Sequence, residues 1–166
     1  MMKEKKDSDT RGIRAVDNRE YLGMLCELLK EGRSVKLMVA GNSMAPFLAH
    51  GRDEVMLSPV EGELKKGDIV LYQRDNGEYI LHRIRKIKDR KYEIIGDGQR
   101  RGECFVRRDQ IIARAVWVLR KGIKTEPGDF WWDFFEGFWL KIIPLRGILR
   151  RLYPRWLMER KQKKAI

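Results

Sequence analysis

Ser43 is the side chain in this sequence best placed to act as a nucleophile. It follows an extended apolar segment and a glycine-led turn that starts at Gly41, and Pro46 marks a bend shortly after it. Such a turn lifts a hydroxyl out of a sheet beside free backbone N–H groups, which nucleophilic catalysis requires. Gly-x-Ser turns are also common in proteins, and the alternative is that Ser43 caps a short helix through residues 46–48.

His82 is the candidate base for the Ser43 hydroxyl. Strand alternation places Ile80, His82 and Ile84 on one apolar face, so we expect the imidazole to be buried. A buried imidazole stays neutral at pH 7 and can accept a proton. The alternative is a core histidine whose ring is satisfied by a backbone carbonyl. The second histidine, His50, falls in a loop and is expected to be exposed.

A carboxylate beside the histidine would fix the imidazole tautomer and stabilise the imidazolium. The candidates are Asp97, in the segment Gly96-Asp97-Gly98-Gln99, and Glu103 a little further on. Gly-Asp-Gly is also an ordinary turn, so the alternative is a loop without a chemical role.

Taken together, these segments resemble the ordered boxes of type I signal peptidases. The likeness is greatest to the Ser/His variant found in endoplasmic reticulum, archaeal and some Gram-positive enzymes. Self-cleaving repressor-type peptidases share a similar serine box. The boxes, which span most of residues 34–120, read Gly41-Asn42-Ser43-Met44-x-Pro46, Gly67-Asp68-Ile69-Val70, His82-Arg83-Ile84 and Gly96-Asp97-Gly98-Gln99.

The resemblance implies a β-rich peptidase fold in which Ser43 is the nucleophile. His82 then stands where bacterial signal peptidases carry a lysine base, and Asp97 or Glu103 supplies the orienting acid. These roles would make the protein a serine endopeptidase that works through a Ser43/His82 dyad.

The resemblance also implies an oxyanion hole and a substrate class. Many members carry a serine two residues before the nucleophile, whereas this chain has Gly41, so backbone groups at Gly41 and Ser43 would have to supply the hole. Met44 and its apolar neighbours would wall pockets for small side chains. The substrate would be a peptide or precursor protein, added as an extended segment to a sheet edge.

The elements that must position these residues are mainly strands. A leucine stripe predicts a helix over residues 18–32 that ends at Gly32, and Asn76-Gly77 predicts a tight hairpin turn. The fold class is therefore mainly β, antiparallel and partly barrel-like, with an N-terminal helix and a helical C-terminal tail. The predicted strands are 34–40, 54–58, 69–74, 78–87, 91–95 and 110–120.

Charge and aromatic residues gather near the C-terminus. The 166 residues carry a net charge of +12, and nine Lys/Arg against one acid lie within residues 137–166. We therefore divide the chain into four parts: a flexible N-terminus (1–17), the helix (18–32), a β peptidase domain (33–124) and a basic aromatic tail (129–166). The tail is predicted to form helices over residues 130–143 and from 145 to about 161.

The composition also suggests partners. Aromatic residues flanked by Lys and Arg suit an interfacial helix, so residues 130–164 are expected to contact an anionic membrane surface. The alternative is that these aromatics pack on the β domain. A nucleic-acid partner is not expected, because no recognised binding motif accompanies the charge.

Other features bear on cofactors and location. The two cysteines, Cys26 and Cys104, are too few for a disulfide framework or a zinc site, so we expect no metal and no cofactor. The first 20 residues lack an apolar core, so we expect neither signal peptide nor anchor, and a cytoplasmic protein with peripheral membrane contact. The competing function is a catalytically inactive β module that binds peptide or a membrane surface through the tail.

Overall fold

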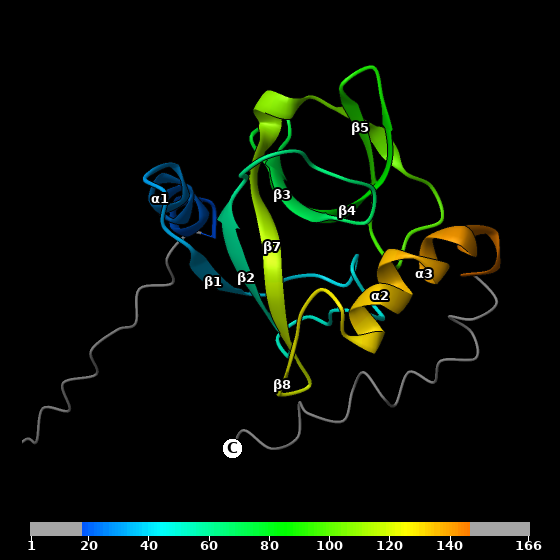
Figure 1. Cartoon of the computed structure of the whole chain (residues 1–166). Helices are drawn as coiled ribbons and strands as arrows, with labels where there is room; N and C mark the ends of the chain where they lie inside the picture. Colours follow the sequence, from blue (N-terminus) through cyan, green and yellow to red (C-terminus); the bar gives the residue numbers. More distant parts are fainter. Residues whose placement is uncertain (1–17, 147–166) are drawn as a thin grey trace, which may run out of the picture.

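The computed structural model describes residues 18–146, and an antiparallel sheet of eight strands forms its centre (Figure 1). The strand order is β1-β2-β7-β3-β4-β5-β6, with β8 added to β7, so the sheet is open and β1 and β6 are its edges. The strands are β1 (Val35–Met38), β2 (Glu54–Pro59), β3 (Ile69–Gln73), β4 (Tyr79–Lys88), β5 (Lys91–Ile95), β6 (Glu103–Val106), β7 (Ile111–Arg120) and β8 (Ile123–Thr125).

This architecture confirms the predicted mainly β, antiparallel fold with an N-terminal helix, α1 (Asn18–Lys30). Each of the six predicted strands is present with ends within two residues of those expected. The hairpin between β3 and β4 turns at Gly77, whose φ of 83° is a conformation that glycine adopts without strain. The predictions for residues 1–17, and for the tail beyond residue 146, lie outside the described residues.

β7 joins the two halves of the sheet. It pairs with β2 on one side and with β3 on the other, and its residues alternate between buried and partly exposed positions. One core cluster contains Leu29 of α1 together with Phe47 and Phe135, while a second contains Val70 and Ile84. β3 is buried on both faces because it lies between these clusters.

The C-terminal residues up to Arg146 belong to the same folded unit as the sheet. The predicted helix over 130–143 is divided at Gly137 into α2 (Phe130–Glu136) and α3 (Phe138–Lys141), which a 3-10 turn, η2 (Ile143–Leu145), follows. Phe135 packs on Phe47 with ring centroids 4.8 Å apart. Trp132, Phe135 and Trp139 also belong to the main core, so part of the aromatic stretch packs on the β domain, while the expected boundary at residue 129 stays a prediction.

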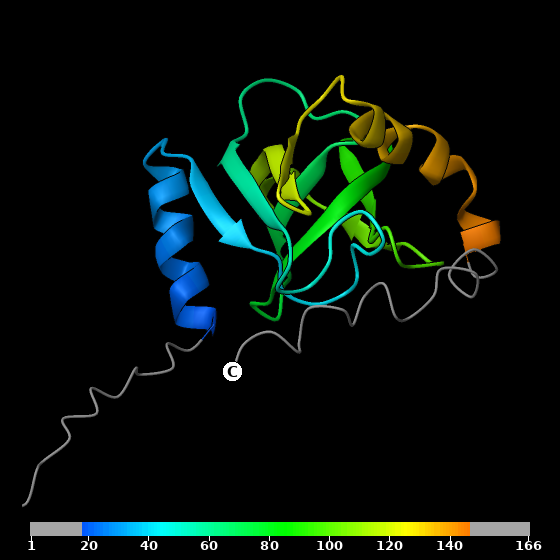
Figure 2. The same ribbon diagram turned by 90° about the horizontal axis from the view of Figure 1, so that it is seen from below.

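The N-terminal and C-terminal helices lie at opposite ends of the sheet. Figures 1 and 2 both show α1 at one end of the sheet and α2 with α3 at the other. Within residues 18–146, no helix has the length and the apolar character needed to cross a bilayer.

Candidate active site

The segment that carries Ser43 is a turn fixed from beneath by apolar side chains. Met44, Phe47 and Leu48 are buried in the main core, and the Leu48 amide donates to the Met44 carbonyl at 2.9 Å. Ser43 itself is half-buried, and residues 43–47 form a turn, so Ser43 does not cap a helix. Met44 anchors this turn as a core residue. Its predicted role in a substrate pocket stays a prediction.

Gly41 is hydrogen-bonded through its backbone amide. Its φ is 79°, and its amide donates a hydrogen bond to Nδ1 of His50 at 3.0 Å. This N–H would have to leave His50 to stabilise an oxyanion, and the expected role of Gly41 as an oxyanion donor stays a prediction. His50 is exposed, as predicted, and its ring braces the turn. The Ser43 amide remains the candidate donor.

His82 lies in β4 opposite Val70 of β3, and its side chain is only 2% exposed. The Tyr72 ring is 6.4 Å away between centroids, and Ile84 on the same strand is fully buried. The strand alternation therefore places His82 on an apolar face, as expected. This environment disfavours the charged imidazolium.

Gly96 marks the place where His82 and the serine turn meet. A methyl group on Gly96 would lie 2.4 Å from the Ser43 carbonyl oxygen and 3.1 Å from His82 Nε2. The next glycine, Gly98, donates its N–H to the same Ser43 carbonyl at 2.7 Å. Three segments far apart in sequence thus converge, and His82 Nε2 lies beside the backbone of Ser43.

The two glycines are needed for this close approach. Neither Gly96 nor Gly98 is among the glycines with positive φ, so a turn conformation does not require them. A methyl group on Gly98 would lie 2.8 Å from the Ala45 carbonyl oxygen, a distance that Cβ atoms do not adopt. The interpretation of Gly-Asp-Gly as a turn is confirmed, since the Gln99 amide donates to the Gly96 carbonyl at 3.0 Å, and this turn also packs backbone against backbone on the serine turn.

A Gly96→Ala variant tests this convergence. The methyl group must displace the Ser43 carbonyl, and we expect a loss of about 1–3 kcal/mol in the free energy of unfolding by urea. Because small misplacements of reacting groups have large rate effects, cleavage of the substrates proposed below should fall at least about 100-fold. The matched control is Gly23→Ala in α1, where a methyl group meets nothing within 4 Å. Equal stability and activity in the two variants would contradict the convergence.

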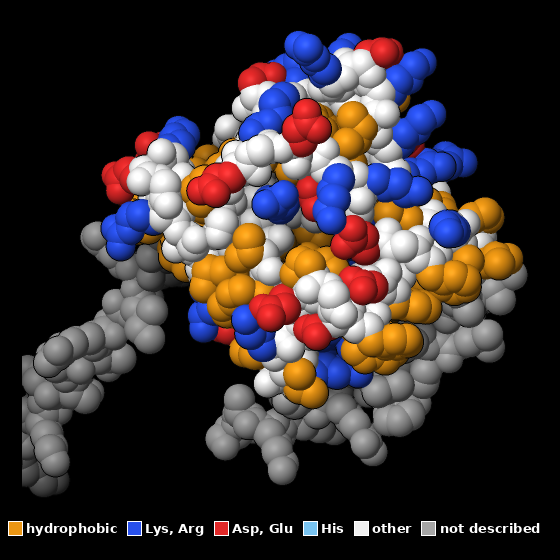
Figure 3. Space-filling model, viewed as in Figure 1, with side chains coloured by type: hydrophobic (Ala, Val, Ile, Leu, Met, Phe, Trp, Pro, Cys, Tyr) orange, Lys and Arg blue, Asp and Glu red, His pale blue; other side chains and the backbone are white. Residues whose placement is uncertain are grey.

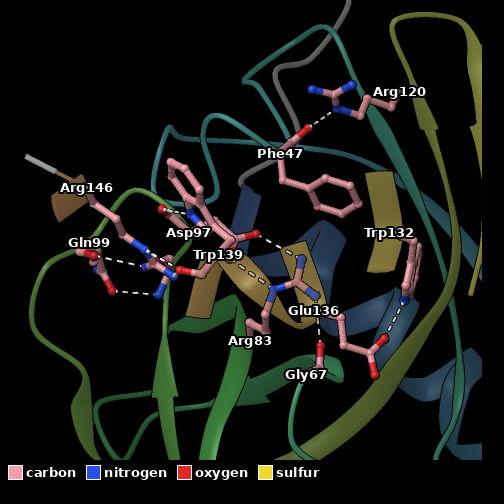
Figure 4. A network of polar contacts seen from close by, with 11 residues as sticks. Phe47, Gly67, Arg83, Asp97, Gln99, Arg120, Trp132, Glu136, Trp139 and Arg146 are labelled. Atoms are coloured by element: carbon pink, nitrogen blue, oxygen red, sulfur yellow. Dashed lines mark hydrogen bonds and ion pairs between the residues drawn. The ribbon is translucent and has the colours of Figure 1, made fainter. Parts of the chain in front are cut away.

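Asp97 is paired with Arg83. Arg83 Nε donates to Asp97 Oδ1 and Nη2 to Oδ2, both at 3.0 Å, and Nη1 donates to the Gly67 carbonyl at 2.8 Å (Figure 4). Both side chains are fully buried, and the guanidinium lies 5.2 Å from the Phe47 ring centre. The carboxylate expected to orient His82 therefore accepts hydrogen bonds from a guanidinium through both of its oxygens.

Glu103, the other candidate acid, lies in β6, where its backbone is in register with Ile94 of β5. The side chain of Glu103 lies outside the described part of the structure, and its predicted role as an orienting acid stays a prediction.

Two C-terminal residues that the sequence analysis did not single out hold the loop that carries Asp97. Trp139 Nε1 donates to the Asp97 carbonyl at 2.9 Å. The buried guanidinium of Arg146 donates to the carbonyls of Gly96 and Gln99, both at 3.1 Å, and to that of Trp139 (Figure 4). The Trp139 indole and the Arg146 guanidinium thus fix the backbone of this loop.

The charge of Arg146 was visible in the sequence, but its role was not. Nothing in the sequence separates it from the other cations of the basic segment, and only the fold brings it to the loop. Burial lowers the pKa of the Arg146 guanidinium to about 10, an effect that the nearby Asp97 carboxylate opposes. Arg146 therefore remains charged at neutral pH.

Within residues 18–146, no three His, Cys, Asp or Glu side chains gather in a way that would hold a metal ion. No protein-family model matches the chain, and no curated protein matches it.

Proposed function

We propose that this protein is a serine endopeptidase of the signal-peptidase type, with Ser43 as nucleophile and His82 as general base. The observation that carries the proposal is the convergence at Gly96, where the Ser43 carbonyl and His82 Nε2 approach the same position. The proposal also uses the half-buried position of Ser43 and the buried position of His82, because an adjacent general base is what activates a serine hydroxyl. The order of the sequence boxes around these residues supports the same function.

The proposed reaction needs only these two side chains and water. His82 takes the proton from Ser43 Oγ as this oxygen attacks a peptide carbonyl, and the Ser43 N–H stabilises the oxyanion. His82 then gives the proton to the leaving amine, and an acyl-enzyme remains on Ser43. Water, deprotonated by His82, attacks the ester, and the proton returns to Ser43 Oγ as the acid product leaves.

The contacts of Asp97 support a dyad of Ser43 and His82. Both carboxylate oxygens of Asp97 accept hydrogen bonds from Arg83, and Arg146 donates to the carbonyls of Gly96 and Gln99 in the same loop. The neutral imidazole is the form of His82 that accepts the proton from Ser43. In this proposal Asp97 orders the loop instead of stabilising an imidazolium.

The substrate is proposed to bind as an extended strand along β1. β1 is an edge strand, paired with β2, and the chain passes from it through Gly41 directly into the serine turn. A peptide that adds to this edge through main-chain hydrogen bonds would bring one of its carbonyls to Ser43.

The experiment is a cleavage screen with the full chain. Extended peptides with small residues on both sides of a candidate bond are incubated with the wild type or with Ser43→Ala, and the products are identified by mass spectrometry. We expect cleavage at a defined bond by the wild type only. Peptides that bind without being cut would instead support the inactive β module.

A further inference from the structure

An exposed row of aromatic rings runs along α2 and α3. We call this row the aromatic ridge and define it as Phe130, Trp131, Phe134 and Phe138. The rings are continuous, since Phe130 and Phe134 lie 6.2 Å apart and Phe134 and Phe138 5.4 Å apart between centroids. Phe130 is 72% exposed and Phe138 54%, although the fold buries other aromatics of the same helices.

Three of the ridge side chains, Phe130, Trp131 and Phe138, are exposed, whereas Phe134 is partly buried and packs against the core. The opposite side of these helices already supplies Trp132, Phe135 and Trp139, which are 3–6% exposed. Figure 3 shows hydrophobic side chains gathered over the part of the surface where Figure 1 places α2 and α3. Soluble monomers rarely expose contiguous aromatic surface of this kind without an interaction partner.

We propose that the aromatic ridge docks on the surface of an anionic lipid bilayer. Aromatic side chains partition into the interfacial region of a membrane, and a single helix face can insert without spanning it. The chain continues from the end of the ridge into residues 147–166, which carry seven Lys/Arg and one acid. Each such cation near an anionic leaflet contributes attraction that falls off within a Debye length.

The charges beside the ridge specify its orientation. Asp129 and Asp133 are exposed at the N-terminal end of α2, whereas Lys141 is exposed at the end of α3. An anionic surface repels the first end and attracts the second, so the Phe138 end enters the interface more deeply. Phe138 should therefore matter more than Phe130, although Phe130 has the larger exposed fraction.

The test is co-sedimentation of the full chain with vesicles of phosphatidylcholine containing about one third phosphatidylglycerol. We expect binding that weakens with added salt and is much weaker on pure phosphatidylcholine. Phe138→Ser should reduce the affinity about tenfold, and Phe130→Ser less. The control is Met24→Ser, which removes a 59% exposed apolar side chain from α1 at the other end of the sheet (Figures 1 and 2) and should bind like the wild type.

Several outcomes would overturn the proposal. Phe138→Ser binding as tightly as the wild type would mean that the basic segment alone contacts lipid. A wild-type protein that does not bind anionic vesicles would mean that residues 147–166 cover the ridge. A wild-type dimer that Phe138→Ser disrupts would mean that a second copy of the chain covers it. Thermal unfolding of each variant verifies that the fold is retained. Ser43→Ala should bind vesicles like the wild type, because Ser43 is not part of the ridge. Loss of vesicle binding therefore tests the membrane proposal, and loss of peptide cleavage tests the peptidase proposal.

Discussion

Ser43→Ala will lower the rate of peptide cleavage at least about 1,000-fold while the fold stays intact. The substitution removes the attacking oxygen, and the binding and oxyanion groups left behind support only weak turnover. The turn keeps its shape because Met44 and Phe47 hold it from the core, and both are buried. The measurement is kcat/KM for the best peptide of the screen, together with the urea midpoint of unfolding.

A second serine provides the matched control. Ser58 of β2 pairs its hydroxyl with that of Ser34 at 2.7 Å, so Ser58→Ala removes the same atom beside the start of β1, at the end of this strand that does not lead into the serine turn. We expect its cleavage rate to equal that of the wild type. Cleavage by Ser43→Ala at the wild-type rate would show that the peptidase activity, if measured, belongs to other residues or to a contaminant.

Arg83→Met will destabilise the protein by about 3–5 kcal/mol, because it leaves the Asp97 carboxylate buried without its partner. Asp97 and Arg83 are both fully buried, so water cannot compensate either charge. The double variant Arg83→Met/Asp97→Asn should lose less than the sum of the single variants, since it also removes the isolated charge. The measurement is the free energy of unfolding in urea.

The control for this pair is an exposed arginine. Arg107 is 51% exposed and forms ion pairs with Asp75 and Asp109, so Arg107→Met should cost less than about 1 kcal/mol. Equal losses from Arg83→Met and Arg107→Met would show that the buried pair does not hold the loop. Arg83→Lys keeps the positive charge but lacks the planar guanidinium that binds both carboxylate oxygens. Its loss in the free energy of unfolding should lie between those of Arg107→Met and Arg83→Met.

The sequence predicts those features of the fold that depend on residues close together along the chain. Alternation in β4 places His82 on its apolar face, and Asn76-Gly77 gives the β3–β4 hairpin, because both signals are local. β6 begins at Glu103 after a charged stretch and β8 has three residues, so neither leaves a strong periodic pattern. The helix predicted to run past Gly137 divides there, since propensity alone does not place such a break.

The sequence predicts the two central side chains of the candidate site but not the contacts around them. Ser43 and His82 were identified from residue types and spacing, but their shared neighbour, Gly96, is recognisable only after the loop packs on the serine turn. The pairing of Asp97 with Arg83 also depends on the fold, because strand alternation alone turns Arg83 away from His82 without naming its partner. Arg146 comes from a segment that looked like a solvent-exposed basic tail.

The central claim, that His82 activates Ser43, is tested most directly by covalent labelling of the full chain. A peptidyl diphenyl phosphonate with small side chains loses one phenol when an activated serine oxygen attacks its phosphorus and forms a P–O bond, and intact-mass measurement counts the adducts. We expect one adduct that maps to Ser43, none in Ser43→Ala, and labelling slowed at least about 100-fold in His82→Gln. Labelling at another serine, or an unchanged rate in a folded His82→Gln variant, would contradict the account.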